Sequence, residues 1–107
     1  MTRGEIWWVS FRTSIGGEIE KQRPAIIISN DISNKYLNRV QVMPLTSKTN
    51  KLYPSEAYIN IKGKKHKAMA DQLTTVSKER LSKRVGFILD SELQDIERVI
   101  KVQLGLS

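Results

Sequence analysis

Hydrophobic positions along this chain fall mainly in short runs that predict strands. Residues 4–11 are rich in aromatic and β-branched side chains, which favour a pleated surface. Residues 24–29 form a continuous apolar run, with Pro24 expected at the first position of its strand. Residues 57–61 alternate between apolar and polar, as a half-buried strand does. The whole pattern predicts about six strands, at residues 4–11, 24–29, 40–45, 57–61, 67–75 and 84–89.

Helical periodicity is clear only at the end of the chain. There the apolar residues recur on one helical face, at Leu93, Ile96, Val99, Ile100 and Leu104. Ser91 and Gln94 predict a capping box at the start of this helix, and Gly105 predicts a left-handed residue at its end.

The segments between the predicted strands are short and rich in turn residues. Residues 12–22 predict a long loop, residues 30–38 a turn containing one helical turn, and residues 77–81 a helical turn capped by Ser77. The lysine-rich run at residues 62–67 predicts a solvated hairpin tip. Close-spaced strands without long intervening helices predict one mainly β (α+β) domain over residues 1–107, a small antiparallel barrel with a C-terminal helix.

The charge of the chain is strongly positive and unevenly spread. Its 18 Lys and Arg residues outnumber 11 Asp and Glu residues, for a formal charge of +7. Residues 90–107 hold four acidic and two basic residues, so residues 1–89 carry +9. This balance favours a polyanionic partner, nucleic acid first, with simple solubility as the alternative.

Several chemistries are excluded by the residues that the chain lacks. No cysteine is present, so neither a disulfide framework nor a thiolate metal site is possible. His66 is the one histidine and is expected to be an exposed loop residue, and no glycine-rich phosphate loop occurs. We therefore expect no metal and no cofactor. No apolar run is long enough for a membrane helix and no signal peptide is evident, so the expected location is cytoplasmic.

Three polar clusters remain as candidate functional residues, each near the end of a predicted strand. A small barrel could bring such strand ends together on one rim. Each cluster also has a purely structural interpretation, as a surface charge, a turn cap or an ion-pair partner. The clusters are Glu18, Lys21 and Arg23; Thr46, Ser47 and Lys48; and Asp71 with Gln72.

Four stretches in this order resemble the MazF/PemK family of toxin endoribonucleases from bacterial toxin–antitoxin systems. They are RGEIWWVSF (3–11), QRPAIIISND (22–31), VMPLTS (42–47) and DQLTTVSKERL (71–81), and the likeness covers nearly the whole chain. The resemblance implies an SH3-like barrel, a homodimer and a cognate antitoxin. It also implies metal-independent cleavage of single-stranded RNA, often messenger RNA.

The resemblance assigns roles to particular residues. The catalytic arginine falls on Arg23, the catalytic threonine on Thr46 and the supporting acid on Asp71. Some members carry an arginine two residues before that acid, where this chain has Met69. Glu18 falls in the substrate-contacting loop.

The chemistry expected of these residues is attack by the ribose 2′-OH on the adjacent phosphodiester, which leaves a 2′,3′-cyclic phosphate and a 5′-OH. A guanidinium can bind two phosphorane oxygens, and the hydroxyls of Thr46 and Ser47 can each add a hydrogen bond. Asp71 and Glu18 are both candidates for the base, and the sequence does not choose between them.

Further residues are candidates for binding RNA. Lys48 could hold a flanking phosphate, and the amides of Asn30 and Gln72 suit base edges. Phe11 is the expected stacking residue, and one of the two neighbouring tryptophans should face the core. Two other functions stay open: a non-catalytic nucleic-acid-binding barrel, and a toxin of the same fold directed at gyrase. A degenerate relative that only binds antitoxin is a third possibility.

Overall fold

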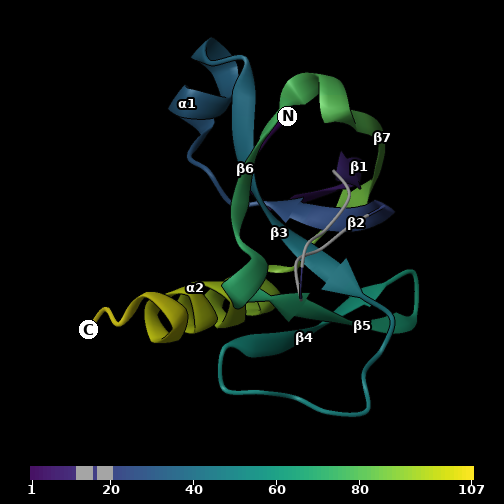
Figure 1. Ribbon diagram of the computed structural model, residues 1–107, viewed down its shortest axis with the longest axis vertical. Coiled ribbons are helices and arrows are strands. Elements are labelled where there is room, and N and C mark those ends of the chain that lie inside the picture. Colours follow the sequence, from purple (N-terminus) through teal and green to yellow (C-terminus); the bar gives the residue numbers. More distant parts are fainter. Residues whose placement is uncertain (12–15, 17–20) are drawn as a thin grey trace.

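The computed structural model describes residues 1–11, 16 and 21–107 (Figure 1). Within this part, the chain forms seven strands, two α-helices and two short 3-10 helices. In chain order they are β1 (Glu5–Phe11), β2 (Lys21–Ile27), α1 (Asp31–Tyr36), β3 (Arg39–Thr46), β4 (Glu56–Ile61), β5 (Lys64–Met69), η1 (Ala70–Gln72), β6 (Thr74–Ser77), η2 (Lys78–Arg80), β7 (Leu81–Phe87) and α2 (Asp90–Leu104).

The strands make one curled antiparallel sheet in the order β4-β5-β3-β2-β1-β7, with β6 also paired to β3. Among the described residues no pairing joins β4 to β7, so the sheet is a half-barrel. Figure 1 shows α2 beside β4, and α1 near the opposite end of the molecule. The predicted mainly β, antiparallel architecture with a C-terminal helix is confirmed.

Strand β3 changes partners along its length. Its first half pairs with β6 on one side, and its residues 42–44 pair with β2 on the other. Beyond Pro44, Leu45 and Thr46 pair with β5. Segments β5 and β6 therefore follow one another along the same edge of β3, separated by η1. The single strand predicted at residues 67–75 is wrong, because a continuous ladder does not form beside Pro44, which has no amide hydrogen to contribute.

Alternate faces of the sheet pack into two cores. Because strand side chains alternate, Ile6 and Ile26 face one core while Val9 and Ala25 face the other. Each fully buried Ile or Val contributes roughly 1.5–3 kcal/mol relative to exposure. The first core, covered by α2, holds Ile6, Ile26, Met43, Leu45, Ala57, Ile59, Ala68, Ala70, Ile88, Ile96 and Val99. The second holds Val9, Ala25, Ile27, Val40, Val42, Val76 and Leu81.

The two tryptophans of β1 follow this alternation. Trp7 packs against the second core, and its indole Nε1 donates to Glu5 Oε1 at 3.0 Å. Trp8 faces the other way and remains 39% exposed. The prediction that one tryptophan faces the core is confirmed.

Several strand boundaries differ from the sequence prediction. The strand predicted at residues 84–89 spans Leu81–Phe87 as β7. Strand β2 begins at Lys21, so Pro24 lies inside it rather than at its first position. The strand tolerates Pro24 because β3 pairs only from Ala25 onward, which leaves one edge of β2 open at the proline. The hairpin tip is only Lys62 and Gly63, both with positive φ, and β5 begins directly after them.

The helices form where they were predicted, with differences at the ends. Asn30 caps α1, since its Oδ1 accepts the Ser33 amide at 2.9 Å. The predicted capping box of α2 is wrong. Glu92 fills that place, because its Oε1 accepts the Leu89 amide and its Oε2 accepts the Asn60 amide of β4, each at 2.9 Å.

The far end of α2 is also only partly as expected. Gly105 is left-handed and ends α2 as predicted, and Ser77 caps η2. Leu104 was expected on the buried face, but it lies 56% exposed, because the helix extends past the sheet.

Glu5 anchors the start of β1. Burial by itself raises the pKa of this carboxyl, but hydrogen bonds from Trp7 and Thr2 and the nearby terminal amino group outweigh it, so the pKa lies below its ordinary value. Arg84 of β7 also lies 3.4 Å from Glu5.

Candidate functional site

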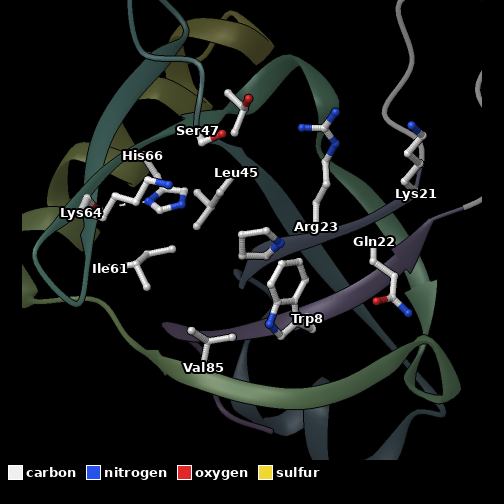
Figure 2. A pocket seen from close by; sticks show the side chains of 12 residues that line it. Trp8, Lys21, Gln22, Arg23, Leu45, Ser47, Ile61, Lys64, His66 and Val85 are labelled. Carbon is white, nitrogen blue, oxygen red and sulfur yellow. Dashed lines mark hydrogen bonds between the residues drawn. The ribbon is translucent and has the colours of Figure 1, made fainter.

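A cleft opens where β2 and β3 part. The last paired residues are Ala25 and Pro44, after which β3 turns to β5 while residues 21–24 of β2 keep only β1 as a neighbour. The resulting cleft has a volume of about 400 Å³ (Figure 2). This volume is within the range of sites that bind small ligands or short segments of larger ones.

The cleft is lined by side chains from six strands and from the loop after β3. Basic and polar groups stand on two of its walls, and apolar groups lie between them. The lining residues are Trp8 of β1; Lys21, Gln22, Arg23 and Pro24 of β2; Leu45, Thr46 and Ser47 at the end of β3; Ile61 of β4; Lys64 and His66 of β5; and Val85 of β7.

The register of β2 and β3 places Arg23 and Thr46 near each other. Arg23 lies two residues before Ala25 and Thr46 lies two residues after Pro44, so both project from the same face of neighbouring antiparallel strands. Arg23 is half-buried and Thr46 is 8% exposed. Figure 2 shows the Arg23 guanidinium standing over the cleft on the same side as Ser47.

Thr46 is held by its own loop. Its Oγ1 accepts the backbone amide of Lys48 at 3.2 Å, so the oxygen is oriented and the hydroxyl hydrogen can donate to a ligand. The sequence interpretation of Thr46 as a turn cap is thus correct in geometry, and it is compatible with a role in binding.

Behind Thr46 lies an ion pair that sequence reasoning missed. Lys67 stands opposite Thr46 in the β3–β5 ladder and pairs with Glu56 at 3.0 Å, with both side chains 10% exposed or less. Lys67 Nζ also donates to the Lys51 carbonyl at 3.0 Å, and Glu56 Oε1 accepts the Tyr53 amide at 2.8 Å. The pair therefore fixes the loop of residues 47–55 that comes after Thr46. Nothing in the spacing of these residues indicated that they were buried together.

The charged side chains among the described lining residues are all positive. Lys21 and Arg23 come from β2 and Lys64 from β5, and no acidic side chain lines the cleft in the part of the chain that the structure describes. Such a site attracts anions, and a phosphodiester is the anion of the expected partner. His66 also lines the cleft. It was expected in an exposed loop, but it is half-buried in β5, because that strand begins three residues earlier than the sequence predicts.

The other predicted site residues lie outside this lining. Asp71 and Gln72 are on η1, Asn30 caps α1, and the Lys48 side chain is exposed in the loop after β3. Phe11 packs against the second core, so Trp8 is the aromatic residue of the cleft. The alternation of the two tryptophans was the signal that could have found it. Glu18 lies outside the described residues.

The described residues form no group of three or more His, Cys, Asp or Glu side chains that could hold a metal ion. In the same part of the chain, no helix is both long and apolar enough to cross a membrane.

Comparisons with known proteins show the family to which the chain belongs. Residues 2–104 match the family described as PemK-like, MazF-like toxin of type II toxin–antitoxin system. Endoribonuclease MazF9 of Mycobacterium tuberculosis is 33% identical over 115 residues, covering 99% of this chain and 98% of the relative.

Solved structures show the same fold. MazF from Deinococcus radiodurans has a TM-score of 0.86 at 22% identity, covering 99% of this chain and 97% of that chain. A mycobacterial endoribonuclease in complex with its cognate antitoxin has a TM-score of 0.84 at 20% identity, covering 100% and 97%. The chain therefore belongs to the family of PemK-like, MazF-like toxins of type II toxin–antitoxin systems, and it is a homologue of the endoribonuclease MazF9.

Proposed function

We propose that this protein cleaves single-stranded RNA without a metal, in the cleft between β2 and β3, at short preferred sequences. The observation that carries the proposal is that Arg23 and Thr46 line one cleft, in which the charged side chains of the described residues are cationic. The reaction needs no metal-activated water, because the nucleophile is the 2′-OH of the RNA itself.

The roles of the two residues follow from where charge develops. As O2′ bonds to phosphorus and the bond to O5′ breaks, negative charge gathers on the non-bridging oxygens. The Arg23 guanidinium can hold two of these oxygens at once, and the Thr46 hydroxyl can hold one. A preorganised donor of this kind lowers the barrier by about 3 kcal/mol. Ser47, exposed at the rim, is proposed to add a further hydrogen bond.

The remaining predicted residues are assigned to RNA beyond the scissile phosphate. Asp71 and Gln72 lie beside β3 on η1, and Lys48 lies in the loop after Thr46, so each can meet RNA that leaves the cleft. Asn30 is engaged at the cap of α1 and would meet a base edge only with its amide nitrogen. We propose that another residue accepts the proton of the 2′-OH, because Asp71 is not among the described residues that line the cleft.

We also propose a homodimer and a cognate antitoxin as partners. Large apolar side chains are exposed at the β7–α2 junction, where Phe87 is 71% and Leu89 62% exposed, and a dimer interface would cover such residues. The mycobacterial relative was solved with an antitoxin, and the +7 charge suits acidic antitoxin segments that compete with RNA. Light scattering after gel filtration should give twice the mass of one chain.

The test of the cleavage proposal is incubation of the purified protein with mixed-sequence RNA in EDTA, followed by sequencing of the 5′ ends. We expect fragments with 5′-OH and 2′,3′-cyclic phosphate ends, at a short shared sequence. Arg23→Ala should remove this activity, whereas Arg39→Ala should retain it. Arg39 is the matched control because it is exposed at the other end of β3, about 23 Å along the strand from Thr46.

RNA that binds but stays intact would identify a non-catalytic nucleic-acid-binding barrel instead. Inhibition of purified gyrase without any RNA cleavage would identify the gyrase-directed alternative. An Arg23→Ala protein that cleaves the same sites as fast as the wild type would remove Arg23 from the mechanism.

A further inference from the structure

The one histidine of the chain stands in the wall of the cleft. His66 lies on β5 opposite Ile59 of β4, and its half-buried side chain lines the same cleft as Arg23 and Thr46. Figure 2 shows the imidazole beside Leu45 and on the opposite side of the cleft from Arg23. A phosphodiester bound between these walls would have the guanidinium on one side and the imidazole on the other.

A backbone hydrogen bond sets the tautomer of this ring. His66 Nδ1 lies 3.1 Å from the carbonyl oxygen of Lys64. Since a carbonyl only accepts, Nδ1 carries the hydrogen, and in the neutral ring the lone pair is on Nε2. A base oriented by a second hydrogen bond is the arrangement that general-base catalysis uses.

Among the described residues that line the cleft, no other side chain is a good proton acceptor. Arg23 and Lys64 have no lone pair to offer at neutral pH, and the oxygen of Thr46 already accepts a hydrogen bond. The described acid named by the resemblance, Asp71, lies on η1 outside the lining. Transfer of the 2′-OH proton to a positioned histidine near neutral pH contributes typically 10²–10⁴-fold, so a histidine here would be effective.

We propose that His66 is the general base of the RNA cleavage, an inference that rests on the proposed function. Nε2 accepts the proton of the ribose 2′-OH as O2′ bonds to phosphorus and the bond from phosphorus to O5′ breaks. The departing O5′ takes a proton from water, and the imidazolium returns its proton to the solvent. The step leaves a 2′,3′-cyclic phosphate and a 5′-OH and consumes no other reactant.

His66 shares the cleft with basic side chains on two strands and with apolar side chains on three others. The charged groups that line the cleft with it are Lys64 from β5 and Lys21 and Arg23 from β2. The neighbours from β3, β4 and β7 are apolar: Leu45, Ile61 and Val85. A limb of the pH–rate profile that is present in the wild type and absent from both His66 variants would report on this residue.

The experiment measures single-turnover cleavage of an RNA oligonucleotide from about pH 5 to 9, for wild type, His66→Gln and His66→Ala. Both variants should lose about 10²–10⁴-fold in rate and lose the acidic limb of the profile. Added imidazole should restore part of the rate to His66→Ala. Affinity for the same oligonucleotide with a 2′-deoxy group at the scissile position should stay within about twofold of wild type. Lys65→Gln, next to His66 but on the other face of β5, should behave as wild type.

Each other outcome overturns a distinct claim. Variants that keep the wild-type rate and profile would overturn the base assignment, while wild-type cleavage to the cyclic phosphate would leave the proposed function standing. Weaker binding with an unchanged rate in the bound complex would make His66 a binding contact only. A wild-type protein that cleaves nothing would end both proposals. If His66→Ala does not fold, the profile of His66→Gln decides.

Discussion

The two walls of the cleft are built in different ways. The β2–β3 wall brings Arg23 and Thr46 together through strand register alone, and both residues lie within short sequence motifs. The β4–β5 wall depends on a buried ion pair between Lys67 and Glu56 that also secures a nine-residue loop, residues 47–55. The first wall therefore presents Arg23 and Thr46, whereas the second carries His66 and determines the position of the loop after Thr46.

This contrast has a consequence for mutation. A change on the β2–β3 wall should remove chemistry and leave the fold intact, because the side chains that act there contribute little to either core. A change in the buried ion pair should alter stability and, through the loop, the position of Thr46. Variants of each wall therefore test whether the β2–β3 wall determines activity and the β4–β5 ion pair determines stability.

On the β2–β3 wall, Thr46→Val should lower activity much more than stability. Valine keeps the shape of threonine but loses the hydrogen bond from the Lys48 amide, so the free energy of unfolding should fall by only about 1 kcal/mol. Loss of the hydroxyl should slow cleavage about 10²-fold, measured as kcat/KM on a defined oligonucleotide. Thr75→Val, an exposed threonine on β6, is the control and should cleave normally. Equal slowing in both variants would show that the effect is not local to the cleft.

The largest effect on stability is expected from Lys67→Met. Removal of the lysine leaves Glu56 buried without its partner, which should cost about 3 kcal/mol and lower Tm by more than about 10 °C. Cleavage should fall as well, because the loop after Thr46 loses its anchor.

Two further variants control for this interpretation. The double variant Lys67→Met with Glu56→Gln should recover part of the lost stability, because it no longer buries an unpaired charge. Lys65→Met removes an exposed lysine that lies 3.8 Å from the Tyr58 ring, and should cost less than about 1 kcal/mol. A Lys67→Met protein as stable as the wild type would contradict the role given to the ion pair.

The difference between the walls also explains what the sequence could predict. Strand positions and the C-terminal helix follow from local patterns, since alternation and glycine ends are properties of short segments. The grouping of Arg23 with Thr46 came from the family resemblance that the motifs around them carry. The break at η1 and the burial of Lys67 and Glu56 depend on which strand lies next to which residue. Lysine and glutamate are almost never fully buried unless paired, and pairing across strands cannot be seen in a single segment.

His66 and Phe11 are two site residues whose positions the sequence alone predicted wrongly. His66 was expected in a loop because lysines surround it in sequence, yet the two-residue turn at Lys62 and Gly63 begins β5 early enough to carry it into the cleft wall. Phe11 was preferred for stacking because of its nearness to the loop, but the alternation of β1 directs it to the second core.

A third prediction compares the aromatic residues of β1 as RNA contacts. Trp8 lies across from Pro24 in the cleft, so Trp8→Ala should weaken RNA binding about tenfold through loss of one stacked base. Phe11→Ala should instead lower stability and leave the affinity nearly unchanged. Binding is measured with a 2′-deoxy oligonucleotide, and Tyr36→Ala, 74% exposed on α1, is the control. A loss of affinity in Phe11→Ala alone would restore Phe11 as the stacking residue.

The smallest expected effect concerns Glu5, which lies outside both walls and so provides a baseline. Because the folded-state pKa of Glu5 is below its ordinary value of 4.5, the folded state holds fewer protons than the unfolded state around that pH. Its contribution to stability is therefore present above about pH 4.5 and is lost as the pH falls through the folded-state pKa.

Glu5→Gln should lower the free energy of unfolding at pH 6, and the difference in this free energy from wild type should shrink as the pH falls toward about 3, as followed by urea denaturation. Cleavage at neutral pH should be unchanged, and Glu79→Gln on η2 should show neither effect. If the stability difference instead grew as the pH fell, the folded-state pKa of Glu5 would lie above its ordinary value. The hydrogen bonds of Glu5 would then not outweigh its burial.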